Sequence, residues 1–359
     1  MNETSLRIFP RVVAVITAYN SASYVERAIR SIRAQQYPNL DRLLIDDGSL
    51  DSTYENAREA AAATGGVTVL RNERNIGFSG SLNRALALCG SDDLLFVHQD
   101  DVTIDDPTYV ARAVRWMDDP AVALITGQPV GFSRRRLSLT KRIFGRLLFL
   151  DCVDADVSEL SYSLLKADLV RAEAVRRVGG FTFVVNRKLG LEDKLLGSAL
   201  RTAGYRLVKD PRLQYVLDFA RTETLRGFLA KEFEAGQQLG YAVAMGLIIM
   251  NPIDRESAVR RRHRLVQVLT SGCLMIAAAL AIFHPVPGAS VIALILLLRT
   301  AAFVRRADGL SFPERLALAA VGHVHDPTFT LGFGAGVAMG LVGRLRLSRK
   351  GPRVGVCRG

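Results

Sequence analysis

The fold is decided by two stretches, VVAVITAYNS at residues 12–21 and LLIDDGS at residues 43–49. Each begins as a short apolar run rich in valine, isoleucine or leucine and ends in polar residues, which is typical of a buried strand followed by a loop. Residues 24–35 and 53–63, which follow these loops, have apolar residues at helical spacing or are rich in alanine. The stretches therefore predict successive strand–helix units.

The alternation continues along the first 215 residues. Further strands are expected at 67–70, 94–97 and 121–126, and further helices at 79–88, 108–117, 169–178 and 194–203. This order predicts an α/β domain with a mostly parallel sheet and right-handed crossovers. Ligands of such sheets bind beyond the carboxyl ends of the strands, where the polar clusters at 18–21, 46–49 and 98–101 fall.

Composition limits the class of protein. The chain has 359 residues, 49% of them hydrophobic, and a mean hydropathy of +0.17, so it holds one large or two ordinary domains and is not disordered. Its four cysteines form no CxxC pair, which argues against a zinc ribbon or a disulfide framework and fits a reducing compartment. The first ten residues lack the apolar core of a signal peptide, so the first domain is expected in the cytoplasm.

The basic charge is concentrated from residue 255 onward, where 15 Lys and Arg and 4 Asp and Glu account for +11 of the net +12. Residues 265–283 carry no charge over 19 positions, about 28 Å of helix, and 289–304 are apolar except for Arg299. We therefore expect a transmembrane hairpin at 265–304 with both ends cytoplasmic, beside anionic lipid, and with Arg299 snorkelling. A buried hairpin in a soluble domain is the alternative, and few aromatics among the charges argue against nucleic acid.

A third uncharged run at 327–343 contains four glycines and is expected either to lie at the membrane interface or to span it. The expected organisation is therefore a first domain at 1–220, amphipathic juxtamembrane helices at 221–264, the hairpin at 265–304 and a basic tail at 305–359. The basic stretch 134–142 is a candidate loop over phosphates or a solvated run of charge.

Three acidic motifs offer chemistry. In Asp46-Asp47-Gly48-Ser49, a strand-end carboxylate can accept a hydrogen bond from the imide N–H of uracil or thymine, although the motif also suits a turn and a helix cap. In His98-Gln99-Asp100-Asp101, Asp100 is the expected ligand of a divalent ion, assisted by His98 or Asp101; a solvated acidic turn is the alternative.

The third motif, Glu192-Asp193, precedes a predicted helix. A carboxylate at a helix N-terminus is stabilised by the helix dipole in the ionised form that a general base needs. Ordinary acid enrichment in a first helical turn is the alternative.

Taken in order, these motifs with Thr17-Ala18-Tyr19-Asn20, Arg74-Asn75-Ile76-Gly77, Asn83 and Gly179-Gly180-Phe181 resemble family 2 glycosyltransferases of the GT-A fold over residues 10–215. The resemblance implies nucleotide binding by a first loop, a base-binding DDGS motif, a supporting segment, a metal-binding DxD motif and a catalytic base. The corresponding nucleotide residues are Thr17, Ala18, Tyr19, Asp46, Asp47, Asn75, Gly77, Asn83 and Gln99. The corresponding metal residues are Asp100, Asp101 and His98, and the catalytic residues are Asp193 and Glu192.

The resemblance implies an inverting transfer from a UDP- or dTDP-sugar, assisted by Mg²⁺ or Mn²⁺. His98 stands where the DxD motif has its first aspartate, which puts the metal preference in question and favours a dTDP-rhamnose-type donor. With the predicted hairpin, the expected acceptor is a polyprenyl-linked glycan at the cytoplasmic face of the cell membrane. Whether the chain forms a homo-oligomer stays open.

Several alternatives remain. A polyprenyl-phosphate monosaccharide synthase usually shows an Asp-Ala-Asp-type motif, which is missing. A processive synthase needs a QxxRW motif, and the only tryptophan is Trp116. A nucleotidyltransferase needs a glycine-rich N-terminal loop. The remaining alternative is a catalytically inactive membrane scaffold.

Overall fold

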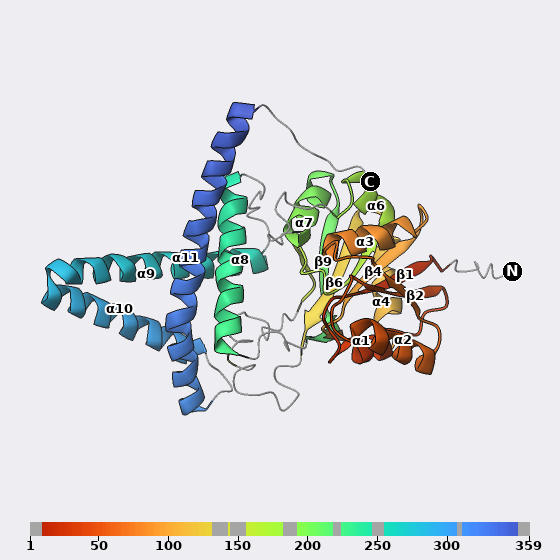
Figure 1. Ribbon diagram of the computed structural model, residues 1–359, viewed down its shortest axis with the longest axis horizontal. Coiled ribbons are helices and arrows are strands. Elements are labelled where there is room, and N and C mark those ends of the chain that lie inside the picture. The colour runs from red at the N-terminus through yellow and green to blue at the C-terminus, as the bar shows by residue number, and fades with distance from the viewer. Residues whose placement is uncertain are drawn as a thin grey trace. The chain divides into compact units, whose positions relative to one another are not determined.

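The computed structural model describes residues 9–130, 143, 156–181, 192–217, 224–245, 255–306 and 311–350. The chain divides into two compact units, one of residues 1–134 and 151–220 and one of residues 135–150 and 221–359 (Figure 1). The predicted basic loop at 134–142 lies outside the described residues.

The described strands of the first unit form a sheet in the order β3-β2-β1-β4-β8-β6-β9-β5, and β7 pairs with β9. Their bounds are β1 Val12–Ala18, β2 Leu40–Asp46, β3 Thr68–Arg71, β4 Leu94–Gln99, β5 Val102–Thr103, β6 Val122–Pro129, β7 Ser158–Glu159, β8 Ala167–Arg171 and β9 Arg206–Leu217.

Strand β1 lies in the middle of the parallel part of the sheet. All seven of its residues are buried, and it pairs in parallel with β2 and with β4. Thr17 therefore lies level with Ile45 on one side and Gln99 on the other. The predicted strands at 12–17, 43–45 and 94–97 are confirmed, and the loops that follow them leave the same edge of the sheet.

The sheet is less parallel than expected, because β8 pairs antiparallel with both β4 and β6. Residues 169–178 were expected to form one helix, and this prediction is wrong in its first part. Leu169 and Val170 belong to strand β8 and are fully buried, and the helix begins only at Ala172. An apolar run of this length does not by itself distinguish a buried strand from a buried helix.

The remaining helices of the first unit agree with the expected spacing. In α1 the predicted apolar face, Val25, Ala28, Ile29 and Ile32, is buried. The bounds are α1 Val25–Arg33, α2 Thr53–Thr64, α3 Phe78–Ala87, α4 Tyr109–Val114 continued by the 3₁₀ helix η1 Arg115–Asp118, α6 Ala172–Arg177 and α7 Glu192–Thr202.

The second unit consists of long helices, α8 Leu225–Met245, α9 Arg255–Phe283, α10 Pro285–Arg306 and α11 Phe312–Lys350. The predicted hairpin is present as α9 and α10, which pack against each other and reverse direction at His284 (Figure 1). Within the described residues, none of the helices is both long and apolar enough to cross a membrane, so the spanning part of the prediction is not supported.

Arg299 also differs from expectation. It was expected to snorkel from a membrane, but it is buried within the helical unit. Its guanidinium donates to Asp326 Oδ2 at 2.7 Å, to Ser271 Oγ at 3.1 Å and to the Gly322 carbonyl at 3.2 Å. The charge thus has a partner on a neighbouring helix, which the hydropathy of its own segment does not reveal.

Helix α11 also differs from expectation, because residues 327–343 are part of one continuous helix that passes through Pro327. Glycines hold α11 close to α8. A Cβ atom added at Gly236 would overlap the Phe329 carbonyl oxygen, and one added at Gly336 would overlap that of Gln237. Such close backbone contact packs α11 against α8 on the carboxyl side of Pro327.

Candidate functional site

Three loops meet at the carboxyl edge of the parallel strands: the first at residues 18–21, the second at 46–49 and the third at 98–101. The Asp47 N–H donates to the Ala18 carbonyl at 2.8 Å, which joins the first two loops. The Tyr19 N–H lies 3.4 Å from Asp100 Oδ2, which joins the first loop to the third. The structure therefore brings together Thr17, Ala18 and Tyr19 with the two acidic motifs, as the strand order requires.

Asp47 lies at the centre of the second loop and is almost fully buried. Its Oδ1 accepts hydrogen bonds from Asn72 Nδ2 at 2.8 Å and from the Ile76 N–H at 2.9 Å, and its Oδ2 accepts one from the Gly77 N–H at 2.9 Å. The Gly77 N–H also lies 3.0 Å from Asn75 Oδ1. Because a carboxylate oxygen has two lone pairs, Oδ2 retains the capacity to accept a further N–H.

Asp46 is fully buried and faces the protein instead. Its carboxylate pairs with Arg71 Nε at 3.1 Å and accepts from the Ser49 N–H at 3.3 Å. Gly48, which follows Asp47, has φ of 67°, and a side chain there would collide with the backbone of Arg74. Asp46 and Gly48 thus shape the loop, and Asp47 carries its acceptor atoms.

Asn83 supports the site from a distance. Its amide donates to the Phe181 carbonyl and accepts from the Phe181 N–H, both at 2.9 Å. This pair of bonds ties helix α3 to the Gly179-Gly180 turn that ends α6, 98 residues later in the chain. The structure therefore gives Asn83 a scaffolding contact.

The third loop separates its predicted ligands. His98 is fully buried and lies 3.4 Å from Ser31 Oγ of α1, and burial lowers the pKa of its imidazole to about 4. Asp101 pairs with Lys166, whose ammonium lies 2.8 Å from Oδ2. Asp100 is the carboxylate that lies beside Tyr19. Among the three predicted metal ligands, only Asp100 is thus placed next to the first loop.

Gln99 binds a segment that the sequence analysis did not single out, residues 161–166 before β8. Its N–H and its side-chain amide donate to the carbonyls of Lys166 and Leu165, each at 3.0 Å. Leu165 is buried and has φ of 52°, a left-handed conformation that costs a non-glycine residue about 1–3 kcal/mol. The surrounding hydrogen bonds therefore hold a strained turn in place.

The same segment reaches helix α7. The Lys194 ammonium lies 4.9 Å from the centre of the Tyr162 ring, and a side chain at Gly197 would overlap the backbone of Ser161 and Tyr162. Residues 161–166, which we call the bridging segment, thus contact both the third loop and the helix that carries the predicted base. The positive φ of Leu165 is invisible in the sequence, because leucine rarely adopts it.

Glu192 and Asp193 form the first turn of α7, as predicted. Asp193 Oδ1 accepts from the Lys194 N–H at 2.7 Å, and the Lys194 ammonium lies 3.4 Å from Oδ2. Burial lowers the pKa of Lys194, but the nearby carboxylates outweigh it and raise that pKa overall. Asp193 is partly exposed, so a hydroxyl group can reach it.

The residues at this edge offer an incomplete set of ligands for a divalent ion. Within the described part of the chain, no group of three or more His, Cys, Asp or Glu side chains is arranged to hold a metal. Asp100 supplies hard oxygen atoms, while Asp101 is paired and His98 is turned away. This set suits an ion held by Asp100 together with oxygen atoms of a bound diphosphate, and does not form a complete site by itself.

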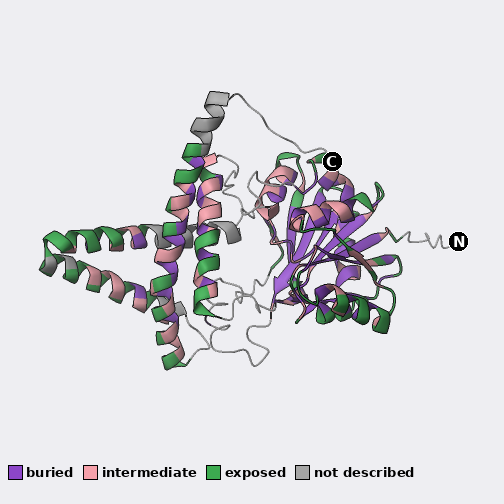
Figure 2. Ribbon diagram, in the orientation of Figure 1, coloured by how far each residue is buried: buried purple, intermediate pink, exposed green. Residues whose placement is uncertain are grey.

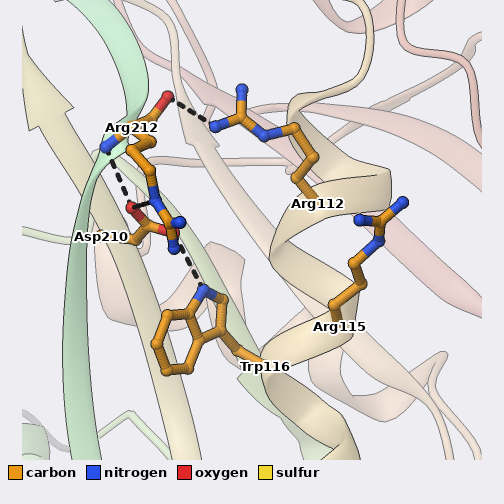
Figure 3. A pocket seen from close by; sticks show the side chains of 5 residues that line it. All are labelled: Arg112, Arg115, Trp116, Asp210 and Arg212. Carbon is orange, nitrogen blue, oxygen red and sulfur yellow. Dashed lines mark hydrogen bonds and ion pairs between the residues drawn. The ribbon is translucent and has the colours of Figure 1, made fainter. Parts of the chain in front are cut away.

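A separate cavity of about 350 Å³ lies in the first unit between α4, η1 and β9 (Figure 3). It is lined by Arg112, Arg115, Trp116, Asp210 and Arg212. Asp210 accepts from the Trp116 indole and from Arg212, so much of its polar lining is already paired. None of the predicted site residues lines this cavity.

Comparison with known proteins agrees with this geometry. Residues 13–179 match the family model described as Glycosyl transferase family 2. An uncharacterized glycosyltransferase of Haemophilus influenzae is 32% identical over 109 residues, 30% of this chain and 33% of that protein. Glycosyltransferase GlyA of Streptococcus pneumoniae is 26% identical over 114 residues, 31% of this chain and 16% of that protein. The match thus spans a third of the length of these relatives or less, and supports transferase activity.

Among solved structures, the mannosyltransferase PcManGT from Pyrobaculum calidifontis, in complex with GDP-Man and Mn²⁺, resembles the chain with a TM-score of 0.58 and 19% identity. The likeness covers 93% of this chain and 88% of that one. It shows that the chain shares the fold of that protein.

Proposed function

We propose that this chain, whose residues 13–179 match the family model described as Glycosyl transferase family 2, is an inverting glycosyltransferase that uses a nucleoside-diphosphate sugar. The nucleoside binds at the first two loops, where Asp47 Oδ2 accepts an N–H of the base. Asp193 takes the proton from an acceptor hydroxyl as its oxygen attacks the anomeric carbon. The bond to the diphosphate breaks in the same step, so the configuration inverts and no covalent intermediate forms.

The observation that carries this proposal is the meeting of the three loops through the Asp47–Ala18 and Tyr19–Asp100 contacts. These contacts bring the carboxylates of Asp47, proposed to accept from the base, and Asp100, proposed to bind the ion, to either side of one loop at the carboxyl edge of the sheet. Ligands of open α/β sheets bind at this position. The arrangement suits a ligand with a nucleoside at one end and phosphates at the other.

Asp100 is the residue that would hold Mg²⁺ or Mn²⁺ together with the diphosphate. A bound divalent ion supplies charge neutralisation of the departing nucleoside diphosphate. The mannosyltransferase of similar fold is complexed with GDP-Man and Mn²⁺. GDP-sugars therefore join UDP- and dTDP-sugars, including dTDP-rhamnose, as donors to test.

The hairpin supports an acceptor carried by lipid, a polyprenyl-linked glycan at the cytoplasmic face of the membrane. Ile282, Phe283 and Val286 at its turn are each more than three-quarters exposed, and much of the outside of α9 and α10 is also exposed (Figure 2). Apolar side chains that project on all sides of a turn suit a lipid surface, into which they would insert without the helices crossing it. Lipid attachment would place the enzyme beside such an acceptor.

The test measures release of nucleoside diphosphate from UDP-glucose, dTDP-rhamnose and GDP-mannose, with vesicles that contain a polyprenyl-linked acceptor. For the donor that supports turnover, Asp193→Asn is expected to lower the rate about 10²- to 10⁴-fold and to leave nucleoside-diphosphate binding unchanged. Glu173→Gln is the matched control, because Glu173 also lies in the first turn of a helix, α6. Nucleotide binding without turnover by the wild type would instead support the inactive scaffold, and no binding by folded protein would refute the proposal.

A further inference from the structure

Lys166 occupies a place in the site that the known motifs do not explain. Strand β8 runs antiparallel to β4, so the residue before β8 lies beyond the carboxyl end of β4. Lys166 Nζ lies 2.5 Å from Gln99 Oε1 and 2.8 and 2.9 Å from the two carboxylate oxygens of Asp101. Its ammonium is thus held directly on the third loop.

The third loop needs positive charge if it is to receive a donor. It carries the carboxylates of Asp100 and Asp101, and a diphosphate brings further negative charge to the same place. His98 is fully buried beside Ser31 Oγ of α1 and does not face the rest of the third loop. In the described part of the chain, Lys166 is the cation whose contacts place it on this loop.

Lys166 is also able to change partner. Its side chain and that of Asp101 are each about one-fifth exposed, so the pair faces the solvent side of the loop. A lysine ammonium has three donors on a flexible stem and rotates readily from one acceptor to another. Its backbone cannot follow, since the Lys166 and Leu165 carbonyls are bonded to Gln99. The geometry fixes the base of the side chain and leaves its tip able to move.

We propose that Lys166 binds the diphosphate of the donor sugar nucleotide, exchanging its contact with Asp101 for one with a phosphate oxygen. This inference rests on the proposed function and adds to it a positioning residue supplied by the bridging segment. Asp101 serves in this scheme as the partner that holds the ammonium while the site has no donor. Lys166 thereby supplies positive charge to the diphosphate, in addition to the ion that Asp100 would hold.

The experiment measures binding by calorimetry to the full chain, for UDP, GDP and dTDP and for the nucleosides uridine, guanosine and thymidine. For the nucleoside diphosphate that the wild type binds, Lys166→Gln is expected to weaken the affinity by about 10- to 100-fold, the effect of losing a charge-assisted hydrogen bond. Affinity for the matching nucleoside is expected to stay within about twofold. Lys166→Arg is expected to restore most of the loss, because arginine also binds phosphate.

Arg206→Gln is the matched control, because Arg206 pairs with Asp119 and Glu159 at the opposite, amino end of β9. It removes the same charge from the unit and is expected to change neither affinity. Equal diphosphate binding by wild type and Lys166→Gln would overturn the inference and leave the proposed function standing. An equal loss of nucleoside and diphosphate would show a merely structural role and also overturn it. If the wild type binds none of the six probes, the proposed function itself fails.

Discussion

Two buried groups on neighbouring strands should give the first unit opposite responses to acid. Burial lowers the pKa of His98 on β4 from 6.5 to about 4, and raises the pKa of Asp168 on β8 from 3.8 to about 6. His98 pairs with Ala167 and Asp168 with Val97, so the two side chains lie on opposite faces of the sheet. Each can therefore be changed without disturbing the contacts of the other.

The sign of each effect on stability follows from the protonation form of the group that the folded state favours. Neutral His98 is favoured in the folded state, so its contribution is complete above pH 6.5 and is lost as the pH falls towards 4. Protonated Asp168 is favoured in the folded state, so its contribution is complete below pH 3.8 and is lost as the pH rises towards 6. At pH 4.5, relative to pH 7.5, His98 costs about 2.5 kcal/mol and Asp168 contributes about 2 kcal/mol. The two effects nearly cancel in the wild type.

Single substitutions should separate them. Relative to the wild type, His98→Gln is expected to gain about 2.5 kcal/mol of stability when the pH falls from 7.5 to 4.5, and Asp168→Asn is expected to lose about 2 kcal/mol over the same interval. Urea unfolding followed by the fluorescence of Trp116 measures this, because the only tryptophan lies in the first unit. The contributions of all other titrating groups are shared with the wild type, so they cancel when the wild-type stability is subtracted from that of the variant at each pH. Parallel stability profiles for the two variants would refute the reasoning.

Three further predictions concern packing and the site. Gly236→Ala should destabilise the helical unit by about 1–3 kcal/mol in thermal unfolding followed by circular dichroism, whereas Gly334→Ala, with open space around it, should be neutral or stabilising; equal effects would contradict the close contact. Asn83→Ala should lower stability in the Trp116 urea assay by about 1–3 kcal/mol through its lost bonds to Phe181, and an unchanged midpoint would show these bonds to be dispensable. Asp100→Asn should abolish any gain in nucleoside-diphosphate affinity on adding Mn²⁺, and a gain that persists would place the ion elsewhere.

The parallel strands and their loops could be predicted because the information is local. A β-branched run that turns abruptly polar marks the end of a strand, and parallel strands put such ends at one edge. The meeting of Asp47 and Asp100 around Tyr19 follows from the order of β2, β1 and β4. Helical spacing likewise identified the buried face of α1.

What the sequence did not reveal depends on partners far along the chain. Strand β8 exists because residues 167–171 fit between β4 and β6, and its apolar run resembled a helix. Gln99 and Asn83 hydrogen-bond to residues 66 to 98 positions away, so their scaffolding contacts cannot be recognised locally. The burial of Arg299 depends on Asp326 in the same way.

The glycine contact between α8 and α11 also limits how these helices can change in length. Gly236 and Gly240 lie against carbonyls of α11, and Gly332 and Gly336 lie against carbonyls of α8, and the members of each pair are four positions apart. Deleting one residue within either helix would rotate everything beyond it by about 100° and turn its glycines away from the partner. A single insertion or deletion inside either helix is therefore expected to break this contact. Registers that again oppose glycine to carbonyl are spaced by four residues, about 6 Å along the axis, so the pair fits together only in discrete steps.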